Sequence, residues 1–141
     1  MSAAEFLDTN ILVYAVYLDS PDKRAVAQKL VTRALAEQTA VISFQVVQET
    51  LQVLTRKSRV IATSDDTQDF LVNVLTPLCK VHPSTALYAR ALRIQSARGF
   101  SFCDSLILAA SLESGSKRLL TEDLQHGQQV DGLRIENPFL G

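Results

Sequence analysis

Asp8 is the first residue whose type and position indicate chemistry. It lies in the stretch "EFLDTNILVYA", between two apolar runs that are expected to be buried. Removing an unpaired carboxylate from water costs several kcal/mol or raises its pKa. Asp8 therefore requires a helix N-terminus to cap, a basic partner or a metal ion.

Glu49 and Asp123 are acids whose surroundings leave a functional and a structural role open. Glu49, in "VVQETLQVL", borders the apolar stripe of an expected helix, and the positions three and four residues away carry only Gln and Val. Asp123, in "RLLTEDLQHG", follows an apolar strand as Asp8 does, with the competing acid Glu122 beside it. The structural alternatives are a solvated helix face for Glu49 and a turn or cap for Asp123.

Asp104 lies in "FSFCDSLILAA", in the first turn of an expected helix that is apolar nearly all round and therefore buried. Its structural alternative is strong, because Ser101 and Asp104 match the S-x-x-[DE] capping box. Asp8 could likewise cap the helix that follows it, although Asn10 could do so equally well. The four acids indicate a common function only if the fold brings them together.

The elements that must position these acids are predicted from apolar periodicity and helix caps. Strands are expected at 4–7, 40–44, 79–82 and 118–121, with a weaker one at 132–138, and helices at 20–38, 45–58, 64–78, 84–99 and 101–115. Strands that alternate with helices predict an α/β fold with a parallel sheet. The length of 141 residues is that of one domain, so residues 1–141 are expected to form a single domain.

One edge of such a sheet collects the carboxyl ends of the strands and the helix starts that follow them. Asp8, Glu49, Asp104 and Asp123 could converge there. Clustered carboxylates repel one another and cannot all stay ionised without a cation. Ligation by oxygen alone is what Mg²⁺ or Mn²⁺ takes. The sequence therefore predicts a divalent metal site made by these acids.

The composition excludes several classes of protein. It is 47% hydrophobic and 21% charged, as in a globular chain, and no run of about 18 apolar residues predicts a membrane span. Cys79 and Cys103 fit no metal-ligand spacing, and no secretory signal is recognisable, so a reducing cytoplasm is expected. A net charge of -1 argues against a basic coat, so RNA or DNA would have to meet local basic patches.

Four motifs resemble those of PIN-domain ribonucleases: "FLDTNILVYA", "QVVQETLQVL", "FSFCDSLILAA" and "LLTEDLQHG". The match spans essentially the whole chain and is most specific for the toxins of bacterial VapBC toxin–antitoxin modules. The resemblance implies a three-layer PIN-like α/β fold with a short, mainly parallel sheet flanked by helices. It also implies Mg²⁺- or Mn²⁺-dependent endonucleolytic cleavage of RNA in the cytoplasm, a homodimer and a small antitoxin partner.

The same resemblance assigns a role to each motif residue. Asp8 and Asp104 correspond to the main metal ligands, Glu49 and Asp123 to the other two acids of the catalytic centre, and Asn10 and Thr121 to supporting polar positions. The segment "SFCDS" departs from the family, since many relatives carry an aromatic residue and then Asp-Ala there; Cys103 is expected simply to pack. The implied reaction is hydrolysis of a phosphodiester by metal-activated water.

RNA and an antitoxin place different demands on the protein surface. Basic residues that could flank an RNA groove are Arg56, Lys57 and Arg59, and Arg90, Arg93 and Arg98. His82 and His126 have no partner at a useful spacing and are expected at the surface or in turns. An antitoxin is expected to send a basic side chain, best an arginine, into the acidic pocket and to lay an amphipathic helix beside residues 45–58.

Two other functions remain open from the sequence. A phosphoaspartyl hydrolase or a receiver domain would use Asp8 as nucleophile or phosphoacceptor with Mg²⁺. Phosphatases of this kind, however, place a second Asp where this chain has Asn10. A PIN fold without catalytic activity could instead act only as a binding module, which requires that the acids are misplaced.

Overall fold

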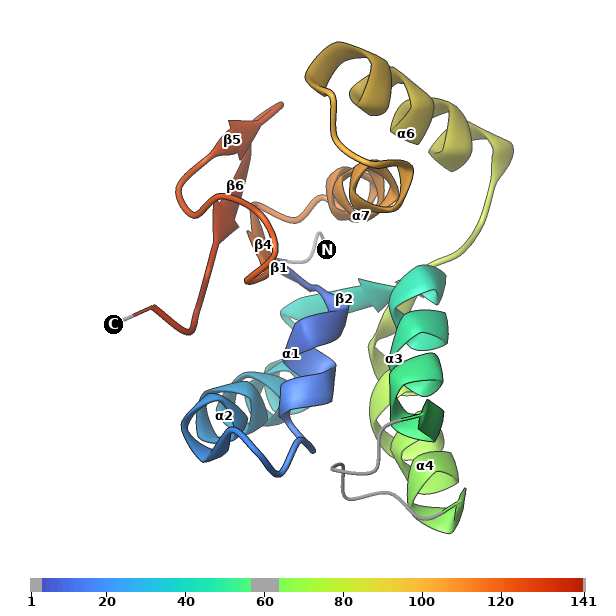
Figure 1. The fold of residues 1–141 in the computed structure, drawn as a ribbon. Helices are drawn as coiled ribbons and strands as arrows, with labels where there is room; N and C mark the ends of the chain where they lie inside the picture. Colours follow the sequence, from blue (N-terminus) through green and yellow to red (C-terminus); the bar gives the residue numbers. More distant parts are fainter. Residues whose placement is uncertain (1–3, 57–63, 141) are drawn as a thin grey trace.

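A six-stranded sheet forms the centre of the computed structural model, which describes residues 4–56 and 64–140 (Figure 1). The strands are β1 (Glu5–Leu7), β2 (Ala40–Ser43), β3 (Cys79–Val81), β4 (Arg118–Leu120), β5 (Gln129–Val130) and β6 (Leu133–Glu136). Their order in the sheet is β3-β2-β1-β4-β6-β5, and only the β5–β6 pairing within the described residues is antiparallel. The predicted short, mainly parallel sheet is thus confirmed.

The helices follow the predicted pattern closely. They are α1 (Thr9–Tyr14), α2 (Pro21–Glu37), α3 (Phe44–Arg56), α4 (Ser64–Phe70), α5 (Thr76–Leu78), α6 (Thr85–Arg98) and α7 (Phe102–Glu113), with the π-helical segment η1 (Leu71–Leu75) between α4 and α5. The helix expected at 64–78 therefore changes its hydrogen-bonding pattern through η1. Pro77 gives the physical reason, because it has no amide hydrogen to complete a regular α-helical turn.

The helices cover the two faces of the sheet. In the view of Figure 1, α6 and α7 lie above β2, and α1 and α2 lie below it. Apolar strand residues fill the space between these layers, and Phe6, Ile42 and Leu119 are completely buried. Strands that are buried on both faces need near-continuous apolar sequence, which "EFL", "AVIS" and "RLL" supply. The fold is the expected three-layer α/β arrangement.

Helix α7 is the most deeply buried helical element near the acids. Every residue from 105 to 111 is buried, as the apolar periodicity predicted. Across the described part of the chain, we find no helix of the length and hydropathy that a membrane crossing demands. The sheet, α3 and α7 together place the acidic residues at the carboxyl edge.

Candidate metal centre

Five acidic side chains line one cavity of about 470 Å³ at the carboxyl edge of the sheet, the four predicted acids and Glu122. Asp8 follows β1, Glu49 lies in α3, Asp104 lies in the first turn of α7 and Asp123 follows β4. Parallel strands direct their carboxyl ends to one edge, so residues far apart in the sequence meet there. The structure therefore brings all four sequence-predicted acids to one site, while their chemical roles remain predictions.

Asp8 is a buried carboxylate that accepts hydrogen bonds, and no basic side chain of residues 4–56 and 64–140 lies beside it. Its Oδ1 accepts from the backbone N–H of Thr9 at 2.7 Å, which caps α1, and its Oδ2 accepts from the Thr121 hydroxyl at 2.8 Å. Burial nevertheless raises the pKa of Asp8 from 3.8 to about 6, and the charges of Asp123 and Glu49 add to this rise. The capping interaction does not offset the cost of desolvation.

Glu5, a second buried carboxylate three residues earlier, is neutralised in the usual way. It is 5% exposed, against 7% for Asp8. Its oxygens pair with Arg33 at 3.3 Å and with Arg118. Among residues 4–56 and 64–140, no such cation contributes to the environment of Asp8. A buried carboxylate such as Asp8 can be accommodated by a helix cap, a basic partner or a metal ion. The described residues supply no basic partner and the cap is insufficient, which favours a metal ion.

Glu49 and Asp104 face the cavity from two helices. Glu49 is half-buried, and its Oε1 accepts from the Thr9 hydroxyl at 3.0 Å, so it does not lie on a fully solvated face. Asp104 is also half-buried, at the point where the buried part of α7 begins. Ser101 Oγ accepts from the backbone N–H of Asp104 at 3.0 Å, which is one half of the predicted capping box. Since that cap uses the backbone of Asp104, its carboxylate stays available to the cavity.

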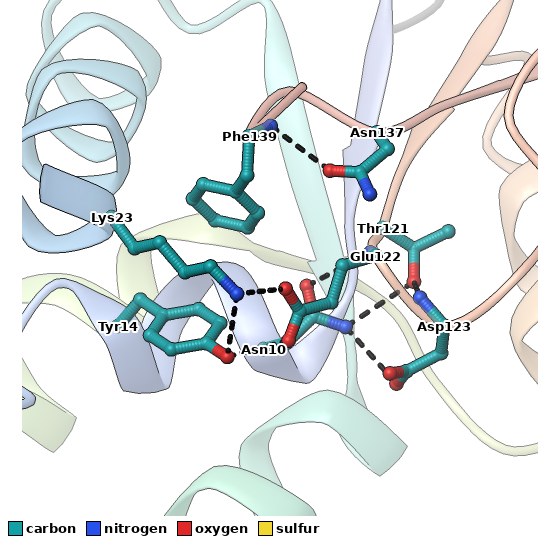
Figure 2. A network of polar contacts seen from close by, with 8 residues as sticks. All are labelled: Asn10, Tyr14, Lys23, Thr121, Glu122, Asp123, Asn137 and Phe139. Atoms are coloured by element: carbon teal, nitrogen blue, oxygen red, sulfur yellow. Dashed lines mark hydrogen bonds and ion pairs between the residues drawn. The ribbon is translucent and has the colours of Figure 1, made fainter. Parts of the chain in front are cut away.

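Asn10 and Thr121 form the polar junction between α1 and the end of β4 (Figure 2). Asn10 Nδ2 donates to Asp123 Oδ2 at 3.1 Å and to Thr121 Oγ1 at 3.2 Å. The backbone N–H of Asp123 also donates to Thr121 Oγ1, at 3.1 Å. Asp8 rather than Asn10 caps α1. The two residues expected to support the acids thus contact Asp8 and Asp123 directly.

Glu122, the competing acid, points away from Asp123 toward α1 and α2. Its Oε1 accepts from the Tyr14 hydroxyl at 2.6 Å, and its Oε2 pairs with Lys23 Nζ at 2.8 Å. Partial burial pulls the pKa of Glu122 up, but the hydrogen bonds from Lys23 and Tyr14 outweigh it and hold the pKa below its usual range. Glu122 therefore carries a compensated charge, unlike Asp8.

The donor set of this cavity fits a hard divalent cation. Besides the four predicted acids, the polar side chains that line the cavity are those of Glu122, Thr9, Asn10, Gln45, Gln52, Tyr14, Tyr17 and Cys103, so most of the donor atoms are oxygens. No three acidic, histidine or cysteine side chains of the described residues stand close enough together to hold an ion. Mg²⁺ commonly takes one or two carboxylates and keeps several waters. The arrangement suits such an open site better than an all-protein cage.

The basic residues predicted to flank RNA lie elsewhere or outside the described chain. Arg90, Arg93 and Arg98 line a separate cavity of about 220 Å³, in which Arg98 pairs with Asp131 at 3.5 Å. Lys57 and Arg59 lie outside the described residues, and Arg56 ends α3. Among the predicted surface histidines, His126 accepts a turn hydrogen bond at Nδ1 from the backbone N–H of Asn137, at 3.0 Å. The α6 arginines therefore do not line the acidic cavity.

The sequence analysis did not identify Gln45 as a residue of the cavity, and its prediction for Cys103 was wrong. Gln45, which is buried, lies one turn before Glu49 on α3, and its Nε2 donates to the backbone carbonyl of Cys103 at 3.1 Å. Its spacing of four residues from Glu49 was a usable signal. Cys103 was expected to pack but is exposed and lines the cavity, because the buried part of α7 starts only at Ser105.

The chain belongs to the PIN-domain family, whose model matches residues 6–130. Members of this family are typically ribonucleases that depend on Mg²⁺. No curated protein matches the sequence. The family assignment agrees with the four acidic motifs from which the resemblance was first drawn.

Solved structures with the same fold come from bacterial toxin–antitoxin systems. A chain of a toxin–antitoxin complex from Klebsiella pneumoniae is 18% identical, with a TM-score of 0.67 and coverage of 95% of this chain and 97% of that one. A chain of VapBC2 from Rickettsia felis, bound to a promoter DNA fragment, is 20% identical, with a TM-score of 0.64 and coverage of 94% and 97%. VapC20 of Mycobacterium tuberculosis, described as a toxin that cleaves the sarcin-ricin loop, is 18% identical, with a TM-score of 0.59 and coverage of 82% and 86%. At these identities the likeness shows a shared fold.

Proposed function

We propose that this protein is a Mg²⁺- or Mn²⁺-dependent endoribonuclease and the toxin of a VapBC-type toxin–antitoxin module in the bacterial cytoplasm. The observation that carries the proposal is Asp8, a buried carboxylate whose pKa is raised to about 6 in a cavity lined by three more predicted acids. An uncompensated acid of this kind costs stability and is retained where function requires it. Membership of the PIN-domain family supports the nuclease class.

The residues of the chain have separable tasks in the proposed reaction. Asp8 and Asp104 would hold the ion, and Glu49 and Asp123 would complete the acidic centre. A bound ion would supply a water of lowered pKa and neutralise charge on the phosphoryl oxygens. The hydrogen bonds of Thr121 to Asp8 and of Asn10 to Asp123 hold two of the four carboxylates in place. Roughly tenfold to 100-fold of activity commonly depends on such supporting contacts.

The remainder of the cavity wall supports a single-stranded substrate. Apolar and aromatic residues also line it: Val13, Tyr14, Tyr17, Val53 and Ile107. Proteins that bind unpaired RNA commonly stack its bases on aromatic side chains. An unpaired segment of RNA, with its bases turned toward this wall, is therefore the substrate class that we propose.

An antitoxin is the second partner in this proposal. The solved relatives from Klebsiella pneumoniae and Rickettsia felis were determined as toxin–antitoxin or VapBC complexes. An arginine side chain would pair well with the clustered carboxylates, because its planar donors match carboxylate oxygens. A largely apolar hollow beside α3, lined by Phe44, Val47, Cys79 and Pro83 among others, supports the predicted seat for an amphipathic helix. A homodimer remains an expectation from the family.

Cleavage of single-stranded RNA by the purified protein tests the nuclease. Wild type should cleave RNA with Mg²⁺ or Mn²⁺ and lose this activity with a chelator, and Asp104→Asn should be inactive. Asp69→Asn, an exposed acid in α4, is the matched control and should keep full activity. A folded wild type that binds the ion and cleaves no RNA would support the binding-module alternative instead.

Expression in bacteria tests the toxin. Wild type expressed alone should arrest growth, Asp8→Ala should be harmless, and co-expression with the adjacent small gene should restore growth. Arrest that persists with Asp8→Ala would show that toxicity does not come from the acidic centre. A harmless, monodisperse wild type that copurifies with no peptide would count against an antitoxin.

A further inference from the structure

Glu122 and Asp123 are adjacent acids at the end of β4 with different surroundings. Asp123 is exposed and accepts a hydrogen bond from Asn10. Glu122 is half-buried, and both of its oxygens are engaged, one by the Tyr14 hydroxyl and the other by Lys23. The two carboxylates are therefore suited to different tasks.

Lys23 is held in place by two aromatic rings as well as by Glu122 (Figure 2). Its Nζ lies 4.8 Å from the centroid of the Tyr14 ring, 5.6 Å from that of Phe139 and 3.3 Å from the Tyr14 hydroxyl oxygen. The rings of Tyr14 and Phe139 pack edge to face, with centroids 5.1 Å apart. The ammonium position is thus built jointly by α1, α2 and the C-terminal segment.

The same cluster is linked to the metal-centre acids through Asn10. The backbone N–H of Glu122 donates to Asn10 Oδ1 at 3.4 Å, and Asn10 Nδ2 donates to Asp123 Oδ2 at 3.1 Å. Tyr14 lies one helical turn after Asn10, so both face the end of β4. Helix α1 is consequently tied to that segment at two successive turns, and Lys23 contacts both partners of the second tie, Tyr14 and Glu122.

The charges around the cavity give Lys23 a second effect. Five carboxylates line the cavity, and its described lining residues include no Lys, Arg or His. Lys23 contacts two of the lining residues, Tyr14 and Glu122, from outside the lining. Without Lys23, Glu122 would be an unpaired carboxylate beside four others, where it would repel them and compete for the cation.

We infer that Lys23 is a positioning residue of this PIN domain: it holds Glu122 away from the metal-binding acids and, through the Glu122 backbone and Asn10, fixes the place of Asp123. Glu122 is accordingly an anchor and not a metal ligand. The inference rests on the proposed function in one respect, because it takes Asp123 as a member of the metal centre.

Amide hydrogen exchange measured by NMR tests the positioning without any nuclease assay. Lys23→Met should cause a loss of protection at the backbone amides of Glu122 and Asp123, whereas Lys23→Arg should keep it. Lys29→Met is the matched control, since it removes an exposed lysine from the same helix and should change neither amide. Unchanged protection in Lys23→Met would overturn the inference.

Mn²⁺ affinity, measured by calorimetry, and the kinetics of RNA cleavage test the consequence for the centre. Lys23→Met should lower Mn²⁺ affinity and kcat roughly tenfold to 100-fold with little change in KM. Adding Glu122→Gln to Lys23→Met should recover part of the affinity, because residue 122 then carries no charge that could compete for the cation. A rise in KM alone in Lys23→Met would indicate that Lys23 contacts RNA. A loss of Mn²⁺ affinity in Glu122→Gln as large as that in Asp123→Asn would indicate that Glu122 is a metal ligand. Either result overturns the inference. If wild type neither binds Mn²⁺ nor cleaves RNA, the proposed function fails, while the exchange measurement still decides the role of Lys23.

Discussion

The Thr121 hydroxyl donates a 2.8 Å hydrogen bond to Asp8 Oδ2 and so joins the ends of the neighbouring parallel strands β4 and β1. Both residues are buried, at 0% and 7% exposed. This contact favours the charged form of Asp8 and opposes the effect of burial on its pKa. Thr121 therefore acts on the charge of the centre as well as on its geometry.

Replacement of Thr121 by Val, which has nearly the same shape, removes this donor and also the oxygen that accepts hydrogen bonds from Asn10 Nδ2 and from the backbone N–H of Asp123. The pKa of Asp8 should then rise further above about 6, because the hydrogen bond that lowers it is lost. A carboxyl NMR titration of Asp8 in the metal-free protein measures this directly. The free energy of unfolding should fall by at least about 1 kcal/mol, since the Thr121 hydroxyl takes part in three hydrogen bonds. A pKa that stays the same or falls in Thr121→Val would contradict the assignment.

Asp8 should make the stability of the metal-free protein depend on pH. The unfolded chain loses the Asp8 proton near pH 3.8, whereas the folded protein keeps it until about pH 6. The contribution of Asp8 to the free energy of unfolding is therefore fully present below pH 3.8. It declines as the pH rises from 3.8 to about 6 and stays low above that pH. The total loss is roughly 3 kcal/mol. Asp8→Asn should stabilise the metal-free protein at about pH 7.5 and not at about pH 4. Urea denaturation at the two pH values checks this, with Asp69→Asn as the control.

Mg²⁺ or Mn²⁺ should raise the melting temperature at about pH 7.5, since the ion relieves repulsion among acids that cluster only in the folded state. At 100 times the dissociation constant the expected gain is roughly 2.7 kcal/mol. The shift should shrink at about pH 5, where Asp8 is protonated according to its pKa of about 6. Differential scanning calorimetry of wild type, Asp8→Asn and Asp104→Asn measures it. Equal shifts in all three proteins would place the ion elsewhere.

Ser101 and Asp104 should separate stability from activity. The cap of α7 uses Ser101 Oγ and the backbone N–H of Asp104, which Asp104→Asn retains. Ser101→Ala should therefore lower the free energy of unfolding by about 1 kcal/mol and leave an active enzyme. Asp104→Asn should do the opposite, abolishing cleavage with little change in stability. A destabilised but active Asp104→Asn would assign the carboxylate to capping.

The sequence was sufficient to predict the sheet and the gathering of the acids, because both follow from periodicity. Apolar segments such as "EFL" and "RLL" define buried strands, and parallel strands place whatever follows them, here Asp8 and Asp123, at one edge. The strand β5 escaped prediction, since only its two residues pair with β6. Its turn depends on the positive φ of Asp131 and Gly132, which a hairpin of this length requires.

The sequence did not predict which groups each side chain contacts. Periodicity places Asn10 and Tyr14 on one face of a helix but does not say which segment that face meets. The difference between Glu122 and Asp123 arises from Lys23, a residue far away in the chain. Such contacts depend on how the layers pack, and local patterns carry no information about them.

Cys103 should make the proposed nuclease sensitive to thiol reagents. Its exposed side chain lines the acidic cavity one residue before Asp104, so a bulky maleimide attached there would fill the space that RNA needs. Cys79 is half-buried, and burial raises the pKa of its thiol, so it should react more slowly. One equivalent of reagent should therefore label Cys103 first, as peptide mass spectrometry can show, and abolish cleavage. Cys79→Ser should remain sensitive, whereas Cys103→Ser should retain cleavage and become resistant. Full activity after complete labelling of Cys103 would mean that RNA does not enter this cavity.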